Sequence, residues 1–391
     1  MMPAVGHLKV DMKRINGLDG IRGVAIILIL IWHYLTCQIH IHHNILLFIK
    51  KITLLSWSGL DLFFVLSGFL ITRILIINQN SENLFRTFYL RRICRIFPLY
   101  YFLLGTFIIL RYLVPKSLIW LFNEPLPLWA YITFTQNYIM GINNTYGPHW
   151  LSSTWSLAIE EQFYLFLPLI IKFYDNKKLP FLFILLILIS PILRLHYSSF
   201  GSYVYTLCRA DSLMSGALLA FILTNKHYMI FCKRNINNFM LIFIALFLGI
   251  MVLADRYNSV GGVFNHLWLS WFYAIFILIV VSDENFWFSK IFNNRILVWF
   301  GLRSYAIYLL HQIYSGILHG YFNSSVPQIF NGKSALLTIS SFFITLFTAE
   351  ISYHFFEKPI MNWGHRLKYT QEMPSPVQLS GIPNSCRTHA G

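Results

Sequence analysis

The sequence predicts an all-α, polytopic membrane protein with about ten transmembrane helices and both termini in the cytoplasm. Of the 391 residues, 57% are hydrophobic, 18% are aromatic and only 12% are charged, and the mean hydropathy is +0.59. A soluble core of this size could not bury so much apolar surface. The apolar residues also fall into separate runs that are long enough to cross a bilayer.

Ten such runs follow one another along the chain. They lie at residues 20–37, 57–77, 97–114, 154–172, 179–197, 209–225, 237–254, 264–282, 296–318 and 335–356. A weaker stretch near 127–140 is interrupted by Pro127, Gln136 and Asn137. We therefore expect it to belong to a long, aromatic outer loop from about 115 to 153 rather than to an eleventh span.

The basic residues set the orientation of these spans. The net charge is +15, with 30 Lys and Arg residues, and ten spans with a cytoplasmic N-terminus place most of these residues inside, as the positive-inside rule requires. An eleventh span would move the basic residues of 172–178 and 226–234 to the outside. Because the charges sit in short loops between apolar runs, they indicate membrane topology and argue against nucleic-acid binding.

A single domain is expected to hold all of the spans. We assign residues 1–359 to an integral-membrane domain and residues 360–391 to a short polar cytoplasmic tail, whose weak hydrophobic pattern predicts disorder. The N-terminal residues lack the compact apolar core and cleavage site of a signal peptide, so we expect the first span to remain. No repeat links the two halves, which weighs against a transporter built from duplicated halves.

Neither a metal site nor a disulfide framework is predicted. The five cysteines show no paired spacing, and we expect free thiols in apolar packing. His40, His42 and His43 form a short cluster, but no second group of ligands accompanies them. We therefore interpret them as loop residues.

Arg22 and His33 are the main candidate site residues of the first span. They lie eleven positions apart, which returns them to nearly the same helix face, about 16 Å apart along the axis. A charge or a titratable ring in hydrocarbon is costly unless it faces protein, water or a ligand. The pair therefore predicts a polar slot that runs into the membrane.

Other polar residues sort by depth in this topology. We expect the outer half of the membrane to hold His33, Asp61, Glu160, Glu161, Asp211 and His311, and the inner surface to hold Arg22, Arg91, Arg92 and Arg95. Either Arg91 or Arg92 shares a helix face with Arg95, because the spacings are i+4 and i+3. This pattern predicts a phosphate cradle below a chamber of carboxylates and histidines.

Each of these residue types also has a structural interpretation. The arginines would anchor a helix to anionic lipid, the acidic residues near helix ends would be caps or ion pairs, and a single histidine would hydrogen-bond two helices. The sequence by itself leaves these alternatives open.

The polar stretches, taken together, resemble the motifs of the acyltransferase 3 family of bacterial integral-membrane O-acyltransferases, which includes O-antigen, exopolysaccharide and nodulation-factor acetylases. LDGIRG followed by His33 is similar to the family's Arg-x10-His signature. Six later blocks match in order: FFVLSGFLI (63–71), RRICRIFPLYY (91–101), WSLAIEEQFY (155–164), RADSLMSG (209–216), SYAIYLLHQ (304–312) and EKP (357–359). The resemblance runs from about Asn16 to Pro359.

This resemblance implies the transfer of an acetyl or other short acyl group from cytoplasmic acyl-CoA to a sugar hydroxyl. The acceptor would be a cell-surface or secreted glycan such as lipopolysaccharide, and the enzyme would lie in the bacterial inner membrane. His33 would be the catalytic histidine, Arg22 its signature partner and Glu160 the motif carboxylate. Many relatives carry a C-terminal SGNH-type domain, so we expect any step of that domain to be absent here or supplied by another protein.

The residue chemistry favours the same reaction. His33 would be the general base, and Glu160 or Asp211 would orient its ring. The phosphates of acetyl-CoA would bind to Arg22, Arg91, Arg92 and Arg95. The acceptor would contact Asp61, Glu161, Tyr308 and His311.

The expected partners are acyl-CoA, a sugar or polysaccharide acceptor that is free or lipid-linked, and membrane lipid, with no metal and no nucleic acid. A covalent acyl-histidine is a second route to the same product. The alternative function is a proton-coupled transporter or flippase of a glycan or lipid-linked sugar, in which the same polar residues would form a path across the membrane.

Overall fold

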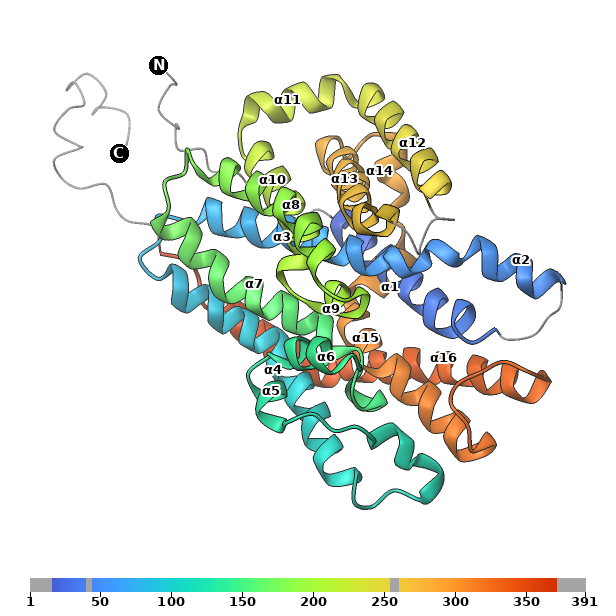
Figure 1. Cartoon of the computed structure of the whole chain (residues 1–391). Helices are drawn as coiled ribbons and strands as arrows, with labels where there is room; N and C mark the ends of the chain where they lie inside the picture. Colours follow the sequence, from blue (N-terminus) through green and yellow to red (C-terminus); the bar gives the residue numbers. More distant parts are fainter. Residues whose placement is uncertain (1–15, 40–43, 254–259, 371–391) are drawn as a thin grey trace, which may run out of the picture.

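The computed structural model describes residues 16–39, 44–253 and 260–370 (Figure 1). Helices make up the regular structure of these ranges, and one isolated bridge joins Ile39 to Ile329. The all-α prediction is therefore confirmed. His40, His42, His43, the two termini and most of the predicted tail lie outside the described residues.

All ten predicted spans coincide with helices. These are α1 (Asn16–Ile31), α3 (Gly59–Ile77), α4 (Leu84–Leu110), α7 (Thr154–Phe173), α8 (Leu179–His196), α10 (Ala210–Leu223), α12 (Ile236–Leu253), α13 (Val260–Ser282), α15 (Arg295–Asn323) and α16 (Gly332–Ser352). The smaller helices are η1 (Trp32–Thr36), α2 (Asn44–Ile52), η2 (Leu54–Ser58), α9 (Ser199–Val204), η5 (Leu207–Arg209), α11 (Lys226–Arg234), α14 (Trp287–Ile291), η7 (Tyr353–Glu357) and α17 (Lys358–His365).

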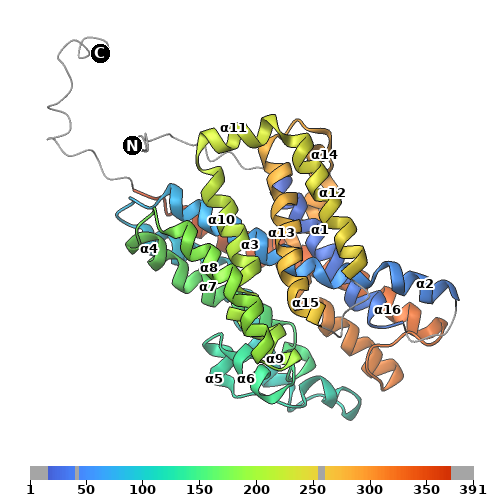
Figure 2. The same cartoon turned by 45° about the horizontal axis from the view of Figure 1, so that its top comes forward.

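Fewer than ten of these helices are both long enough and apolar enough to cross a membrane. Within the described ranges, seven helical segments are long and apolar enough to cross a membrane, or eight if the bent pair α10 and α11 forms one span. Helix α7 is not among them because Glu160, Glu161 and Gln162 lower its mean hydropathy, and α12 contributes only a shorter apolar segment, Ile236–Ile250. The number ten and the cytoplasmic termini stay predictions. Figure 2 shows α11 turning sharply away from α10, and the angle between them is 100°.

Helix α4 begins earlier than predicted. It starts at Leu84 and continues through Pro98 to Leu110, so Arg91, Arg92 and Arg95 lie on the same rigid helix as the apolar segment. The arginines are therefore fixed relative to the membrane core.

The segment between α4 and α7 forms several short helices rather than one long helix, so the prediction that it is no continuous span is confirmed, while its place on the outer side stays a prediction. They are η3 (Lys116–Phe122), α5 (Leu128–Ile132), α6 (Gln136–Asn143) and η4 (His149–Leu151), and they gather at one end of the bundle (Figure 1). Gln136 donates to the carbonyl of Thr154 and Asn137 to that of Val204. These buried amides thus have protein partners, which explains polar residues in an otherwise apolar stretch.

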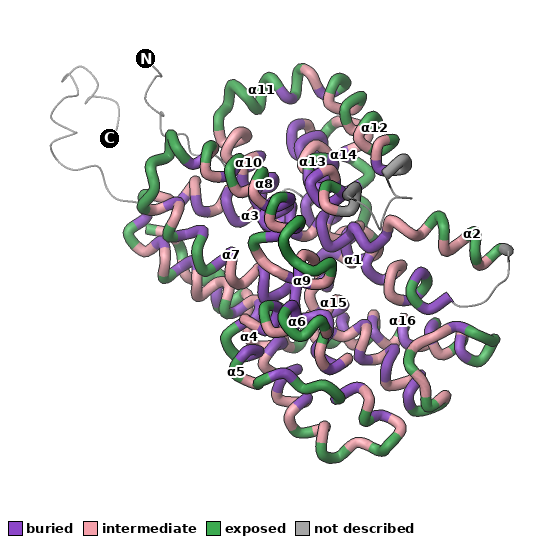
Figure 3. The backbone as a smooth tube through the Cα atoms, viewed as in Figure 1, coloured by how far each residue is buried: buried purple, intermediate pink, exposed green. Residues whose placement is uncertain are grey.

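Glycines allow the central helices to pack with their backbones in contact. A Cβ added at Gly68 of α3 would lie 1.9 Å from the carbonyl oxygen of Leu213 on α10, and one added at Gly301 of α15 would lie 1.8 Å from that of Asp19 on α1. Small residues at helix crossings serve this purpose in membrane proteins. Burial concentrates where these helices meet, whereas α11 carries mostly exposed residues (Figure 3).

Candidate functional site

A cleft lies among α1, α3, α4, α7 and α15, and the space in it that no atom fills is about 740 Å³, part of which is open to solvent. We call this cleft the cavity. Its wall carries polar groups at successive depths along these helices. One end holds Arg22, Arg92 and Arg95, the middle holds Ser67, Glu160 and Tyr164, and the other end holds Ser156 and Tyr308. The cavity therefore includes Arg22, from which the sequence predicts a polar slot toward His33.

The arginine end of the cavity is rich in positive charge. Arg22 pairs with Asp19, one turn earlier on α1, at 2.9 Å. Arg92 and Arg95 lie one turn apart on α4 and both line the cavity. The Nε of Arg92 is buried without a hydrogen-bond partner among the described residues. Guanidinium groups held this way suit phosphate oxygens, which accept paired N–H donors.

Arg91 does not belong to the cavity wall. Its guanidinium donates from Nε to the carbonyl of Leu367 at 3.1 Å and lies 4.9 Å from the ring centroid of Tyr369. The sequence predicted that either Arg91 or Arg92 shares a helix face with Arg95. In the structure it is Arg92 that lines the cavity together with Arg95. The expectation that Arg91 faces the same cavity is corrected, because Arg91 sits about 100° around the helix from Arg92.

Glu160 forms a hydrogen-bonded triangle in the middle of the cavity wall. Ser67 donates to its Oε1 at 3.0 Å, Tyr164 donates to its Oε2 at 2.8 Å, and the two hydroxyls lie 3.1 Å apart. The charges of Arg22 and Arg95 act on this carboxylate. Glu160 is thus oriented toward the arginine end of the cavity.

His33 and His311 form a pair beyond the other end. His33 lies in η1, a π-helical turn after α1, and its Nδ1 contacts the carbonyl of Ile29 at 3.0 Å. The Nδ1 of His311 contacts the carbonyl of Tyr308 at 2.7 Å, and the two imidazole centroids are 4.8 Å apart. A nitrogen that faces a carbonyl must carry the proton, so Nε2 is the basic atom of each neutral ring.

No hydrogen bond joins Glu160 or Asp211 to His33 within the described ranges. The predicted role of either carboxylate in orienting His33 is therefore corrected: the carbonyl of Ile29 fixes the ring instead. His33 lies in a π-helical turn, a feature that is frequent at functional sites.

Tyr308 connects the histidine pair to the cavity. Its ring centroid lies 5.8 Å from that of His311. Its hydroxyl lies 2.6 Å from the Ser156 hydroxyl and donates to the carbonyl of Ser153 at 2.9 Å. His33 itself is not part of the cavity wall, so the slot ends at Tyr308 and Ser156, beside the histidines.

His149 is a site residue that the sequence analysis missed. It comes from the outer segment, its ring lies 4.9 Å from that of Trp120, and its Nε2 contacts the carbonyl of Gln312 at 3.3 Å. Burial lowers the pKa of His149 to about 4, so the ring is neutral near pH 7. It is close enough to His33 for the two rings to interact electrostatically. The only signal in the sequence is its position shortly before the WSLAIEEQFY block.

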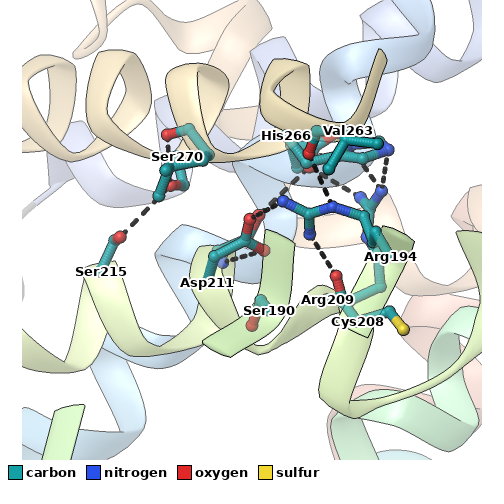
Figure 4. A network of polar contacts seen from close by, with 12 residues as sticks. Ser190, Arg194, Cys208, Arg209, Asp211, Ser215, Val263, His266 and Ser270 are labelled. Atoms are coloured by element: carbon teal, nitrogen blue, oxygen red, sulfur yellow. Dashed lines mark hydrogen bonds and ion pairs between the residues drawn. The ribbon is translucent and has the colours of Figure 1, made fainter. Parts of the chain in front are cut away.

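Asp61 and Asp211 belong to a separate buried network, and Figure 4 shows Arg194, Arg209, Asp211 and His266 of it. Arg209 binds Asp61 at 2.7 Å and Arg194 binds Asp211 at 2.7 Å, with all four side chains almost fully buried. His266 contacts Asp61 at 3.3 Å. The network joins α3, α8, α10 and α13 and contributes nothing to the cavity wall. The structure thus pairs Asp61 with Arg209, and its predicted contact with the acceptor stays a prediction.

Glu161 also lies away from the cavity wall. Its Oε1 is buried and has no hydrogen-bond partner in the described part of the chain, and the charge of Arg92 acts on it. Its predicted contact with the acceptor stays a prediction. No group of three or more His, Cys, Asp or Glu residues that could hold a metal ion occurs in the described ranges.

Comparison with known proteins gives one family. A family model described as an acyltransferase domain, acyltransferase 3, matches residues 15–354. The O-acetyltransferase OatA of Staphylococcus aureus (strain NCTC 8325) is 29% identical over 379 residues, which cover 90% of this chain and 58% of that protein. YrhL of Bacillus subtilis (strain 168), which carries the provisional name of peptidoglycan O-acetyltransferase, is 30% identical over 392 residues, with 92% and 57% covered. The chain thus spans a little over half the length of these relatives. No solved structure matches it significantly.

Proposed function

The chain belongs to the acyltransferase 3 family, and from that premise we propose that it is a membrane O-acetyltransferase. The donor is cytoplasmic acetyl-CoA and the acceptor is a sugar hydroxyl of a surface polymer. The provisional name of YrhL favours peptidoglycan as the first acceptor to test, while no comparison points to lipopolysaccharide. The helical segments that could cross a membrane support a multi-pass protein, which we assign to the bacterial cytoplasmic membrane.

The observation that carries the proposal is the cavity between the arginines and the histidine pair. Acetyl-CoA has phosphates at one end, a long and largely uncharged arm, and a thioester at the other end. The cavity offers Arg22, Arg92 and Arg95 at one end and Ser156 with Tyr308 at the other. The axial rise from Arg22 to His33 is about 16 Å, which is similar to the length of an extended pantetheine arm.

His33 supplies the base for the transfer step. The acceptor oxygen attacks the thioester carbonyl carbon while Nε2 of His33 takes the hydroxyl proton. The new C–O bond forms, the C–S bond breaks, and the CoA thiolate leaves and takes the proton from His33. Because Nδ1 of His33 donates to the carbonyl of Ile29, Nε2 is free for this work.

The test follows labelled acetyl-CoA in membranes that contain the full chain. Acetyl label entering the glycan and release of the CoA thiol are both measured, for the wild type and for His33→Ala. We expect the substitution to lower the rate by about 100-fold or more, the usual contribution of a general base. Equal amounts of protein in the membrane and an unchanged thermal unfolding midpoint serve as the control for folding.

Each outcome decides one part of the proposal. Label in glycan with the wild type alone supports a His33-dependent acetyltransferase. Transfer that survives His33→Ala contradicts the general-base role. Neither label nor thiol release, with peptidoglycan present and both proteins folded, overturns the donor assignment and returns the transporter as the leading alternative.

A further inference from the structure

The residues that follow α17 form a short strap over the start of α4. The amide of Glu82 donates to the carbonyl of Thr370 at 3.3 Å, and the amide of Thr370 donates to the Asn83 side chain at 3.0 Å. Asn83 in turn donates to the carbonyl of Lys368 at 2.9 Å. These contacts fix residues 366–370, here called the C-terminal strap, beside the arginine end of the cavity.

Helix α17 holds the strap in place by close packing. A Cβ added at Gly364 would lie 3.0 Å from the Cβ of Cys94 and 3.7 Å from the Cα of Arg91. The helix therefore approaches α4 at the same turn that carries the arginines. The strap continues from this contact and cannot move far from Arg91 without breaking it.

Tyr369 of the strap has a partly exposed aromatic ring that lies among these cations and packs against the hydrophobic core. Its ring lies 4.9 Å from the guanidinium carbon of Arg91 and is only half-buried. Burial raises the pKa of the Tyr369 hydroxyl, and the charges of Arg91 and Arg92 oppose that rise. The ring is therefore within electrostatic reach of Arg92, which lines the cavity.

We propose that Tyr369, supported by Arg91, binds the adenine ring of the donor, so that the C-terminal strap completes the nucleotide end of the acyl-CoA site. This inference rests on the proposed donor. An aromatic ring supported by a guanidinium is a stacking platform for a base. The adenine of CoA is joined through its ribose to the phosphates, and phosphates bound by Arg92 and Arg95 would bring the base to the neighbouring face of α4. Arg91, which the cavity does not use, lies on that face.

The test compares two donors that differ in the nucleotide. KM is measured for acetyl-CoA and for S-acetylpantetheine, which has the same thioester and arm but no adenine nucleotide, using the full chain in membranes. We expect Tyr369→Leu to raise the KM for acetyl-CoA about tenfold, a typical loss for one base stack, and to leave the KM for S-acetylpantetheine unchanged. Tyr369→Phe keeps the aromatic face and should behave as the wild type.

The control is a second tyrosine that stacks on an arginine away from the cavity. Tyr353 lies 4.5 Å from the guanidinium of Arg303, and neither residue lines the cavity. We expect Tyr353→Leu to leave the ratio of the two KM values unchanged. A parallel rise of both KM values in Tyr369→Leu, or no rise in either, would overturn the adenine site.

Direct nucleotide binding separates this inference from the proposed reaction. The probe is adenosine 3′,5′-bisphosphate, and its Kd is measured for the purified full chain. We expect Tyr369→Leu to weaken binding about tenfold relative to Tyr369→Phe. Binding by the wild type without acetyl transfer would overturn the reaction but keep the site, whereas no binding by an active wild type would overturn the site alone.

Discussion

Arg92 and Arg95 face the cavity, whereas Arg91, within the same turn of α4, binds the C-terminal strap. A guanidinium that faces a cavity without a carboxylate partner is available to an anion, and one that donates to a main-chain carbonyl is already occupied. The three arginines therefore have different expected roles, although their sequence context is almost the same. The difference comes from the helical angle between neighbouring residues, which is about 100°.

We expect Arg95→Gln to raise the KM for acetyl-CoA about tenfold with little change in kcat. The substitution removes a charged guanidinium that binds acetyl-CoA equally well in the ground state and in the transition state. Steady-state kinetics with acetyl-CoA at saturating acceptor provide the measurement. Arg111→Gln is the matched control, because Arg111 lies at the far end of α4 and stacks on Tyr112. An unchanged KM in Arg95→Gln would instead support a role in lipid anchoring.

At the scale of elements, the fit of α3 against α10 depends on two glycines. A Cβ at Gly68 would meet the Leu213 carbonyl, and a Cβ at Gly216 would meet that of Val65 at 1.9 Å. Backbone atoms cannot move aside as a flexible side chain can, so any larger residue separates the helices. This pair of helices presents Ser67 to Glu160, so their spacing also affects the cavity.

Gly68→Ala should therefore lower the free energy of unfolding by about 1–3 kcal/mol or more. Thermal unfolding in detergent, followed by tryptophan fluorescence, reports the change. Gly105 is the matched control, since it lies on α4 with no atom within 4 Å of an added Cβ. Gly105→Ala should be neutral or slightly stabilising, because alanine favours a helix over glycine. Equal losses in both variants would show that the backbone contact is unimportant.

The sequence predicted the positions of the helices better than the contacts of the polar side chains on them. Hydropathy located each long helix, because twenty apolar residues are needed to cross a bilayer, and the break at Pro127 correctly indicated that residues 127–140 form no long helix. Hydropathy could not predict which residues the buried carboxylates contact. Asp61 and Glu160 lie on similar apolar helices, yet one binds Arg209 and the other binds Ser67 and Tyr164. The contact of Glu160 with Tyr164 spans four positions, but those of Glu160 with Ser67 and of Asp61 with Arg209 join residues 93 and 148 positions apart, which no local pattern contains. The resemblance did place His33 and Arg22, but the roles of both stay predictions.

At the scale of the whole molecule, the buried network of Figure 4 ties the helices on one side of the cavity together. Arg209 lies on η5, and its partner Asp61 lies on α3. Its guanidinium also lies 5.2 Å from the ring of Tyr203 and 5.5 Å from that of Phe64. Charges buried this completely are tolerated only when paired, because the desolvation of each ion is costly. The network therefore ties together the helices that carry its residues.

Replacing only one residue of the Asp61–Arg209 ion pair should destabilise the protein more than replacing both. We expect Asp61→Leu to lower the free energy of unfolding by about 3–5 kcal/mol, since Arg209 is left buried without its partner. Asp61→Leu with Arg209→Met should lose less than the sum of the two single losses, because neither charge then remains. Asp283→Ala is the control: its ion pair with Lys233 spans 3.2 Å but leaves the lysine side chain 56% exposed, so at most about 1 kcal/mol is expected.

Thermal unfolding in one detergent is measured for the wild type, the two single variants Asp61→Leu and Arg209→Met, and the double variant. Acetyl transfer per folded molecule measures the effect of each substitution on the reaction. Additive losses would mean that Asp61 and Arg209 stabilise the protein independently, contrary to the pairing at 2.7 Å. A raised KM for acetyl-CoA in a stable double variant would mean that the network shapes the donor site directly. With an intact KM and a strongly non-additive cycle, the network acts on helix arrangement alone, which is what its separation from the cavity wall predicts.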